Sequence, residues 1–362
     1  MVGSRSLLLL DAGVGKHVVP KGVLGLGGKL KVLGIESSCD ETAASVVEDD
    51  LVLSDVVASQ TADHRPYGGV VPEIASRCHM SSIASVIRKA LEDANTELAE
   101  LDGIAATQGP GLTGALLVGL QTAKALAAAR SLPFVGVNHL RGHLLVSRIK
   151  NERDNPDFPY MALLASGGHT GVYLVTCETD ISCLGSTRDD AAGEAFDKVS
   201  KLLDLGYPGG PIIDQLAAEK GPEVTFPQAL RDRRSFEFSF SGVKTAVAQH
   251  IAKQKNPLTQ EQVQAIARGF QRAVIEIMVR KVTLAARRHQ VERVVLGGGV
   301  AANKGLARHA KKVCDQLNLK LFIPPPKLCT DNGSMIAYAG QLALAAGERT
   351  PLSAAPKPDW PI

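Results

Sequence analysis

The chain has 362 residues, 45% of them hydrophobic and 4% aromatic, and a formal net charge of +3. This length predicts about two domains with a sizeable apolar core. The small charge excludes a protein that coats nucleic acid through charge alone, although it is compatible with a local basic patch. The six cysteines include no Cys-x-x-Cys pair, so we expect reduced thiols in a cytosol-like compartment. No apolar run reaches the ~18 residues that a membrane span needs.

Residues 1–30 differ from the rest of the chain, because they are basic and poor in acids. Their apolar run at 7–10 is shorter than the roughly seven to fifteen residues of a signal-peptide core. The segment has the composition of a mitochondrial transit peptide, but a disordered extension ahead of the first strand would have the same composition. Both interpretations stay open.

The first predicted structure is a hairpin. Apolar residues 31–35 form a short strand, a polar turn follows at 36–42, and apolar residues resume at 43–47. The backbone amides and hydroxyls of such a turn can face an anion. The turn contains two adjacent carboxylates, Asp40 and Glu41, which are either an ordinary solvated turn or groups that take part in a reaction.

Helices and strands then alternate. A turn at 67–72 leads into a helix over 73–94, and a strand follows at 102–107. A glycine-rich stretch opens an Ala/Leu-rich helix that runs to about residue 130, with Thr113 as its candidate cap. Because this helix is apolar nearly all round, we expect it in the core or against a partner.

Two histidines follow the next strand, at 134–137. His139 and His143 are spaced i and i+4, which puts both imidazoles on one helix face, close enough to share a metal. Leu140 stands where a zincin protease carries its Glu, and ordinary polar histidines remain the alternative. The best third ligand is Asp331, which requires the last quarter of the chain to fold back onto its middle.

The opening hairpin pattern recurs in the middle of the chain. A charged, proline-bearing stretch at 151–159 predicts a domain joint. A strand at 161–165, a small polar turn at 166–170 and a strand at 171–176 then repeat the earlier pattern. The repeat predicts two lobes of related architecture with a nucleotide in the cleft between them. The alternative is coincidence between two ordinary hairpins.

Acids begin the next two helices. A helix starts within residues 189–198 with acids in its first turns, and after the rigid loop at 207–211 a new helix starts at Asp214. These acids either complement the helix dipoles or, beside the Gly-Gly loop, bind ribose or other hydroxyl groups.

A basic stretch follows, with Arg231, Arg233 and Arg234, then three alternating phenylalanines at 236–240 and Lys244. Basic residues beside aromatic ones suit a nucleic-acid contact. The alternative, which we favour from the sequence, is a solvated loop whose phenylalanines anchor it to the core.

The last quarter of the chain predicts a long amphipathic helix at 260–289, a strand at 293–296, and a triple glycine that leads to Asn303. Bare glycine backbone between a strand and a helix lets a nucleobase or ribose approach closely, and the Asn303 amide can bind either group. The pattern is not GxGxxG, so a Rossmann dinucleotide site is not expected. A last strand at 319–323 and a final helix to about residue 346 complete the prediction.

Ten motifs together resemble one family, the tRNA N6-adenosine threonylcarbamoyltransferases, formerly called O-sialoglycoprotein endopeptidases. The resemblance covers roughly residues 31–362. It rests on these motifs in this order: IESSCDETA, YGGVVPEIASR, GPGLTGALLVG, NHLRGHLL, LLASGGHT, DDAAGEAFDK, YPGGP, FSFSGVKTAV, GGGVAANKGL and CTDNGSMIA.

The resemblance implies an α/β fold of the two-lobed actin/Hsp70-like (ASKHA) type. Each lobe would be a mixed sheet flanked by helices, with the ligand in the interlobe cleft. The expected divisions are an N-terminal extension at 1–30, lobe I at 31–137, lobe II at 138–328, and a C-terminal helix and tail at 329–362 that return to lobe I.

The activity implied by the resemblance is transfer of a threonylcarbamoyl group from threonylcarbamoyl-AMP to N6 of the adenosine 3′ of the anticodon, in tRNAs that read codons beginning with A. The resemblance also implies one divalent metal per subunit, Fe(II) or Zn(II), held by His139, His143 and Asp331. Donor binding carries over to Leu164, Ala165, Ser166, Gly167, Gly168, Asp197, Gly210, Asp214 and Asn303.

The residue chemistry adds roles of its own. We expect Asp40 and Glu41 to position or deprotonate the incoming amine, and the backbone amides of residues 166–168 to bind the phosphate. If the basic stretch does contact tRNA, the candidate residues are Arg231, Arg233, Arg234 and Lys244. Arg141 replaces the Glu that the family commonly carries between its two histidines, and Ala165 replaces a usual Val.

The expected partners are tRNA and helper subunits, namely a paralogous ASKHA partner and a small ATPase, or a second copy of the chain; no membrane is expected. We expect a cytoplasmic protein, or a mitochondrial one if residues 1–30 are a transit peptide. Two other classes stay open: a metalloprotease, and an ASKHA kinase or ATPase. A kinase would need free ATP and a hydroxyl acceptor, whereas the transferase needs a preformed adenylate and tRNA.

Overall fold

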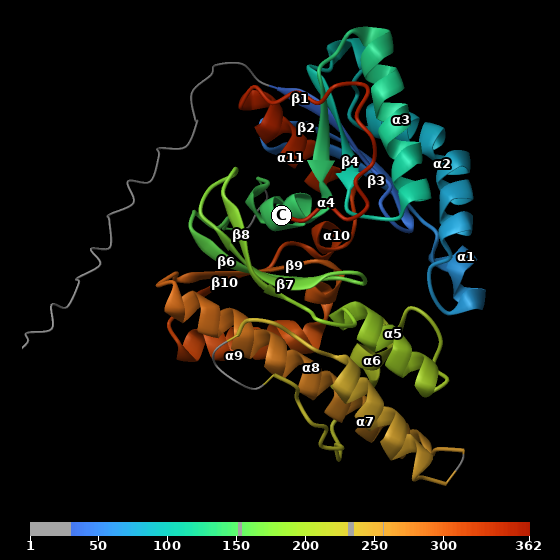
Figure 1. Cartoon of the computed structure of the whole chain (residues 1–362), viewed down its shortest axis with the longest axis vertical. Coiled ribbons are helices and arrows are strands. Elements are labelled where there is room, and N and C mark those ends of the chain that lie inside the picture. The colour runs from blue at the N-terminus through green and yellow to red at the C-terminus, as the bar shows by residue number, and fades with distance from the viewer. Residues whose placement is uncertain (1–29, 151–153, 231–234, 256) are drawn as a thin grey trace, which may run out of the picture.

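The structure is a computed structural model that describes residues 30–150, 154–230, 235–255 and 257–362. Nearly all of the N-terminal extension, residues 1–29, therefore lies outside the described residues. Two five-stranded sheets form the framework of the molecule (Figure 1).

The first sheet has the strand order β3-β2-β1-β4-β5. Its first three strands form an antiparallel meander, and β4 and β5 continue parallel to β1. The strands are β1 (Lys31–Glu36), β2 (Glu41–Glu48), β3 (Leu51–Ser59), β4 (Gly103–Gly109) and β5 (Phe134–Asn138).

The second sheet repeats this topology strand for strand, with the order β10-β9-β6-β7-β8. β6, β7 and β8 are antiparallel, β9 is parallel to β6, and β10 is parallel to β9. The strands are β6 (Tyr160–Ala165), β7 (Thr170–Val175), β8 (Ile181–Ser186), β9 (Arg293–Gly297) and β10 (Lys320–Phe322). The predicted repeat is thus confirmed, and coincidence between two hairpins is the wrong interpretation.

Helices cover both faces of the first sheet. Side chains of a strand alternate between its faces, so Leu33 packs with α2 (Pro72–Asp93) and α3 (Thr113–Arg130), while Val32 packs on the side of α11 (Gly333–Ala345). α11 approaches so closely that a Cβ on Gly34 would lie 2.2 Å from the backbone nitrogen of Ala337. The end of the chain therefore packs directly on its first strand.

The second sheet has its main core on its outer face. Met161, Leu163 and Ala165 of β6 pack there against a helical layer. This layer consists of α5 (Ala192–Leu202), α6 (Gly209–Ala218), α7 (Ser241–Ala252), α8 (Gln260–Arg288) and α9 (Lys304–Gln316). Asp214 lies inside α6, which begins at Gly209, so the prediction of a helix start at Asp214 was wrong.

A third core lies between the two sheets. Leu140 and Leu144 of α4 (His139–Leu145) and Met335 of α11 pack there, together with Val137 of the first sheet and Leu164 of the second. α4 and α11 are therefore held between the lobes, where Figure 1 shows α4 above β6 and β7.

Short elements complete the described fold: α1 (Thr61–His64), α10 (Pro326–Cys329) and the 3₁₀ turns Arg65–Tyr67, Leu98–Glu100, Val146–Arg148 and Gly299–Ala302. Thr113 does not cap α3, because the N-cap position is Leu112 and no side chain bonds there. None of the helices in the described ranges is long and apolar enough to span a membrane.

Candidate active site and metal centre

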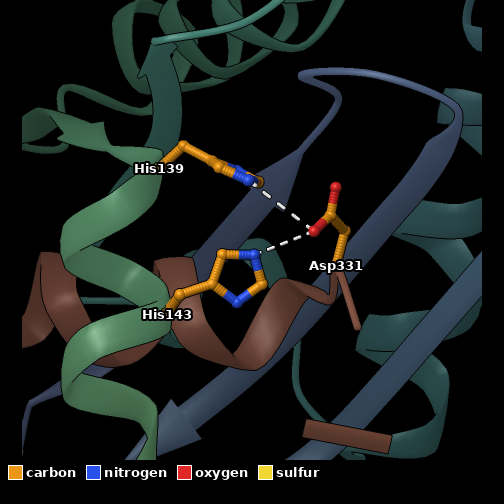
Figure 2. A group of neighbouring side chains, drawn as sticks. All are labelled: His139, His143 and Asp331. Carbon is orange, nitrogen blue, oxygen red and sulfur yellow. Dashed lines mark hydrogen bonds and ion pairs between the residues drawn. The ribbon is translucent and has the colours of Figure 1, made fainter. Parts of the chain in front are cut away.

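The structure brings His139, His143 and Asp331 together although they come from two distant segments (Figure 2). Oδ1 of Asp331 lies 2.9 Å from Nε2 of His143 and 3.6 Å from Nε2 of His139. One potential ligand atom from each residue lies within 4.8 Å of the other two. The last quarter of the chain thus folds back onto its middle, as a shared site requires.

Side-chain caps position both segments. α4 begins directly after β5 at Asn138, whose Oδ1 accepts the backbone N–H groups of Leu140 and Arg141 at 2.9 and 3.3 Å. Asn332, the residue after Asp331, caps α11 in the same way by accepting the N–H of Met335 at 2.8 Å. The two histidines therefore lie on α4, and Asp331 lies just before α11, and each helix has its start fixed by a capping asparagine.

Glu36 is a member of the site that the sequence reading missed. It is fully buried at the end of β1, and its Oε2 lies 2.9 Å from Nδ1 of His139. Thr107 donates to the same oxygen at 2.6 Å, and the Ser38 N–H donates to the other. A carboxylate at Nδ1 leaves Nε2 of His139 directed at Asp331, as in the carboxylate–histidine pairs of metal sites.

The charges of the site favour a cation. Burial alone would lower the pKa of His139, but Glu36 and Asp331 outweigh it and raise this pKa to about 9. Burial alone would raise the pKa of Asp331, yet the neighbouring histidines hold it well below its ordinary value. Two imidazoles and an ionised carboxylate that stabilise positive charge between them are a donor set that fits a divalent iron or zinc ion.

His139 and Asp331 line a cavity of about 580 Å³ between the lobes, and His143 lies behind them. Asp40 and Glu41 lie on its first-lobe side, and the turn at residues 166–169 lies on its second-lobe side. Burial, followed by the negative charges of Asp40 and Asp331, raises the pKa of Glu41 well above its ordinary value. His169 also lines the cavity, and burial next to the two other histidines lowers its pKa to about 4, so its ring is neutral.

A second cavity of about 650 Å³ adjoins the first and shares Gly167, Pro208, Pro211 and Gly299 with it. Its lining includes four further predicted donor-binding residues from three separate stretches of the chain, namely Asp197 of α5, Gly210 and Asp214 of α6, and Asn303 before α9.

Leu164 and Ala165 are placed differently. Both are buried within β6, where their side chains belong to the apolar cores on either side of the second sheet. Neither residue lines one of the two cavities.

The backbone at Ser166 is already engaged, because its N–H donates to the carbonyl of His169 at 2.8 Å. This amide is therefore not available to a phosphate, contrary to the prediction from the sequence. Gly167 and Gly168 have no heavy atom within 4 Å of where a Cβ would be, so there is room for a ligand beside their backbone.

Asn303 caps α9, and most of its amide is used within the protein. Its Oδ1 accepts the N–H of Leu306 at 2.8 Å, and its Nδ2 donates to Oε1 of Gln271 at 2.8 Å. One N–H of the amide therefore remains for a ligand, fewer groups than we expected from the sequence.

Asp214 stabilises the start of α9, the helix that Asn303 caps. It accepts the N–H groups of Lys304 and Gly305 at 3.0 and 3.2 Å, and Nε2 of Gln271 at 3.2 Å. Gln271 thus links Asp214 to Asn303 from the neighbouring helix α8. No local sequence pattern distinguishes it from the other glutamines of α8.

The predicted tRNA contacts receive little support from the described residues. Arg231, Arg233 and Arg234 lie outside them. Lys244 donates to Asp190 at 2.7 Å, so its charge is already balanced. Phe238 and Phe240 are fully buried in the core of the second lobe, which confirms the alternative reading of the aromatic residues.

Comparisons with known proteins point to one family. The sequence model of the TsaD family, described as tRNA N6-adenosine threonylcarbamoyltransferase, matches residues 51–338. The chain is 54% identical to the protein of this name from Sorangium cellulosum (strain So ce56), with 91% of this chain and 96% of the relative covered. It is 50% identical to that of Syntrophus aciditrophicus (strain SB), with 91% and 97% covered.

The chain belongs to the tRNA N6-adenosine threonylcarbamoyltransferase family. It is a transferase that carries a threonylcarbamoyl group to N6 of adenosine in tRNA. The family is metal-dependent, and the described residues provide one group of two histidines and an aspartate that could hold the metal.

Solved structures support the two-lobed fold of this transferase. Full-length HypF in its phosphate- and nucleotide-bound form superposes with a TM-score of 0.59 at 12% identity, covering 87% of this chain and 46% of HypF. The activator of the 2-hydroxyisocaproyl-CoA dehydratase from Clostridium difficile superposes with a TM-score of 0.50 at 13% identity, covering 90% and 100%. The expected actin/Hsp70-like architecture is thus confirmed.

Proposed function

We propose that the donor is threonylcarbamoyl-AMP, which lies across the two joined cavities. Its adenosine occupies the 650 Å³ cavity, and its threonylcarbamoyl group extends into the 580 Å³ cavity beside His139 and Asp331. The acceptor is the adenosine 3′ of the anticodon in tRNAs that read codons beginning with A. The observation that carries this proposal is the junction of a candidate metal centre with an adjoining cavity of adenylate size, in a member of this family.

The cavity walls suggest how the donor is held. Asp197 and Asp214 accept hydroxyl groups of the donor, and the spare N–H of Asn303 donates to it. Gly167, which lines both cavities, and Gly168, which lines the first, leave room for the phosphate next to their backbone. Leu164 and Ala165 act from behind this turn, because their strand fixes where it begins.

In the reaction, N6 of the tRNA adenosine attacks the carbamoyl carbon of the donor. The new N–C bond forms, the C–O bond to the phosphate breaks, and AMP leaves with the electron pair. Burial and the charges of Asp40 and Asp331 raise the pKa of Glu41, which favours its protonated form, so we assign acceptance of the N6 proton to Asp40. A metal held by the two histidines and Asp331 would supply a Lewis acid for the donor's oxygens.

Of the candidate metals we favour Fe(II), because two histidines and one carboxylate with open positions are typical of non-haem iron sites, and zinc is the alternative. We further propose lobe I at 31–137 and lobe II at 138–328. The helix and tail at 329–362 return to lobe I, in keeping with the packing of α11 on β1, β2 and β4.

The partners we propose are tRNA and helper subunits, a paralogous ASKHA protein and a small ATPase, with a second copy of the chain as the alternative. Leu117 remains 39% exposed on α3, which leaves apolar surface for such a partner. We place the protein in the cytoplasm; a mitochondrial location would require residues 1–30 to act as a transit peptide.

The requirement for donor tests the proposal against the kinase or ATPase alternative. Purified protein, metal and unmodified tRNA are incubated either with preformed threonylcarbamoyl-AMP or with ATP alone. We expect modified adenosine with the donor and no phosphoryl transfer with ATP. Phosphorylation of an acceptor by ATP, with no product from the donor, would favour the kinase reading.

Donor binding should depend on pH through Asp197. Burial raises its pKa to about 6, while the N–H of Gly209 partly offsets this effect. An ionised carboxylate accepts hydroxyl groups and a protonated one accepts them less well, so binding should weaken as pH falls through 6. With a pKa of about 6 we expect roughly tenfold weaker binding at pH 5 than at pH 7.

The measurement is the Kd of an adenosine phosphodiester analogue, whose own phosphate does not titrate in this range. In Asp197→Asn the pH dependence should disappear between pH 5 and 7. Equal pH dependence in the wild type and the variant would exclude Asp197 as its source.

Reversing the charge of Arg231, Arg233 and Arg234 to Glu should weaken tRNA binding but leave donor binding unchanged. If each arginine contacts a phosphate, the slope of log K against log salt should fall by about 0.9 for each one lost. A gel-shift titration at several salt concentrations measures this slope. Reversal of Arg88 and Lys89 on α2 provides the control. If the loss of tRNA affinity per reversed charge is the same in the triple variant and in the control, the three arginines do not form a specific tRNA-binding patch.

A further inference from the structure

The C-terminal segment at residues 350–361, here called the strap, is bonded along the first lobe. The Thr350 N–H donates to the carbonyl of Phe134 at 2.8 Å, at the start of the edge strand β5. Further along, the buried Lys124 donates to the carbonyl of Ala354, and Gln108 donates to that of Ala355, both at 2.8 Å. The strap is therefore an ordered part of the fold, and Figure 1 shows the C-terminus beside α4.

The strap then reaches the loop at residues 109–111, which borders the 580 Å³ cavity. The Lys357 N–H donates to the carbonyl of Gln108 at 2.7 Å, and the Gly111 N–H donates to that of Pro358 at 3.1 Å. A Cβ on Gly109 would lie 1.8 Å from the Lys357 carbonyl oxygen, so the loop and the strap fit only without a side chain there. Pro358 itself lines the first cavity.

The last contact of the strap is with the cap of the histidine helix. Asn138 is 7% exposed, and while its Oδ1 caps α4, its Nδ2 donates to the carbonyls of Trp360 and Pro361 at 3.1 and 3.3 Å. One side chain thus uses its acceptor to start α4 and its donors to hold the end of the strap.

We infer that the strap positions the histidine helix, through Asn138, for the metal centre; this inference rests on the proposed function. α4 has only seven residues, so its own hydrogen bonds fix its direction weakly. A shift of its first turn would move His139 away from both Glu36 and Asp331. Sites of this kind need their groups held to within about 0.5 Å, which external ties supply.

Asn138→Asp separates the two functions of this side chain. The aspartate keeps an oxygen for the cap, and its charge suits a helix N-terminus, so α4 should form as before. It has no N–H to donate, so the tie to Trp360 and Pro361 is lost. Asn318→Asp, on an exposed turn far from the site, is the matched control, because it makes the same chemical change without touching the strap.

The test compares the wild type with Asn138→Asp, with a chain that ends at Lys357, and with the variant that combines both changes. The readouts are the Kd of Co²⁺ by chelator competition, the absorption spectrum of the cobalt-loaded protein, and turnover with preformed donor. We expect about tenfold weaker Co²⁺ binding and an altered spectrum in each single variant. Because both changes cut the same tie, the combined variant should be no worse than the shortened chain.

The chain's one tryptophan, Trp360, reports on the strap directly. Its ring lies under Nζ of Lys357 at 4.1 Å, and its fluorescence in Asn138→Asp should shift to the red as the end of the strap loosens. If Trp360 shifts while the Co²⁺ affinity and spectrum stay those of the wild type, the strap does not position the helix. The same conclusion holds if the losses in the two single variants add.

Asn138→Asp decides the question alone if the shortened chain does not fold. Failure of the proposed function would give a different result, because the wild type itself would then form no product from donor and tRNA. The Co²⁺ affinities of the wild type and the variants could still be compared in that case.

Discussion

Replacing His139 or Asp331 with alanine is expected to remove the bound metal and lower transfer activity at least ~100-fold while the protein stays folded. Both side chains lie at the edge of the cleft, and neither belongs to an apolar core cluster. Asp331→Ala also removes the carboxylate that the two histidines face, so His139 and His143 would lose their shared partner.

Metal content after dialysis, circular dichroism and turnover with preformed donor measure these three expectations. His309→Ala provides the matched control, because this histidine of α9 lies away from both joined cavities. It should keep full metal and full activity. Full metal together with full activity in His139→Ala and Asp331→Ala would contradict the assignment of the centre.

Glu36→Gln is expected to have the second largest effect, although the residue does not reach the cavity. The glutamate accepts hydrogen bonds from the Thr107 hydroxyl and the Ser38 N–H, and its Oε2 faces Nδ1 of His139. A glutamine must turn its NH₂ group toward one of these donors, which leaves a buried donor unpaired at a cost of about 1–3 kcal/mol. Without the negative charge, Nδ1 of His139 is held less strongly, and metal affinity should fall about 10–100-fold.

The free energy of unfolding and the metal Kd, both measured on the same preparation, check this expectation. Glu48→Gln, at the other end of the same hairpin and partly exposed, is the control. A Glu36→Gln protein that loses stability but binds metal as tightly as the wild type would show that Glu36 supports only the fold.

The sequence allowed the two-lobed architecture to be predicted because its strongest local signals are repeated. The strand, polar turn and strand around Asp40 recur around Gly167, and each becomes the centre of one sheet. β3 and β8 were missed because their residues are largely half-exposed or exposed and lack a regular apolar pattern. Pairing with β2 and β7, which no local pattern reveals, makes them strands.

The candidate site was partly predictable for a related reason. His139 and His143 are one helix turn apart, so a local pattern was enough to pair them. Glu36 could not be found in this way, because its partners Thr107 and His139 are 71 and 103 residues away. The roles of Asn303 and Gln271 depend likewise on helices that meet only in the folded chain.

Nucleoside mass spectrometry tests the central claim most directly. Unmodified tRNA that reads an A-starting codon is incubated with threonine, bicarbonate, ATP and an extract depleted of this protein. Wild type or His139→Ala is then added back, and the tRNA is digested to nucleosides. We predict that threonylcarbamoyladenosine appears with the wild type and is absent with His139→Ala. Its absence with the wild type, in an extract shown to make the adenylate donor, would contradict the transferase assignment.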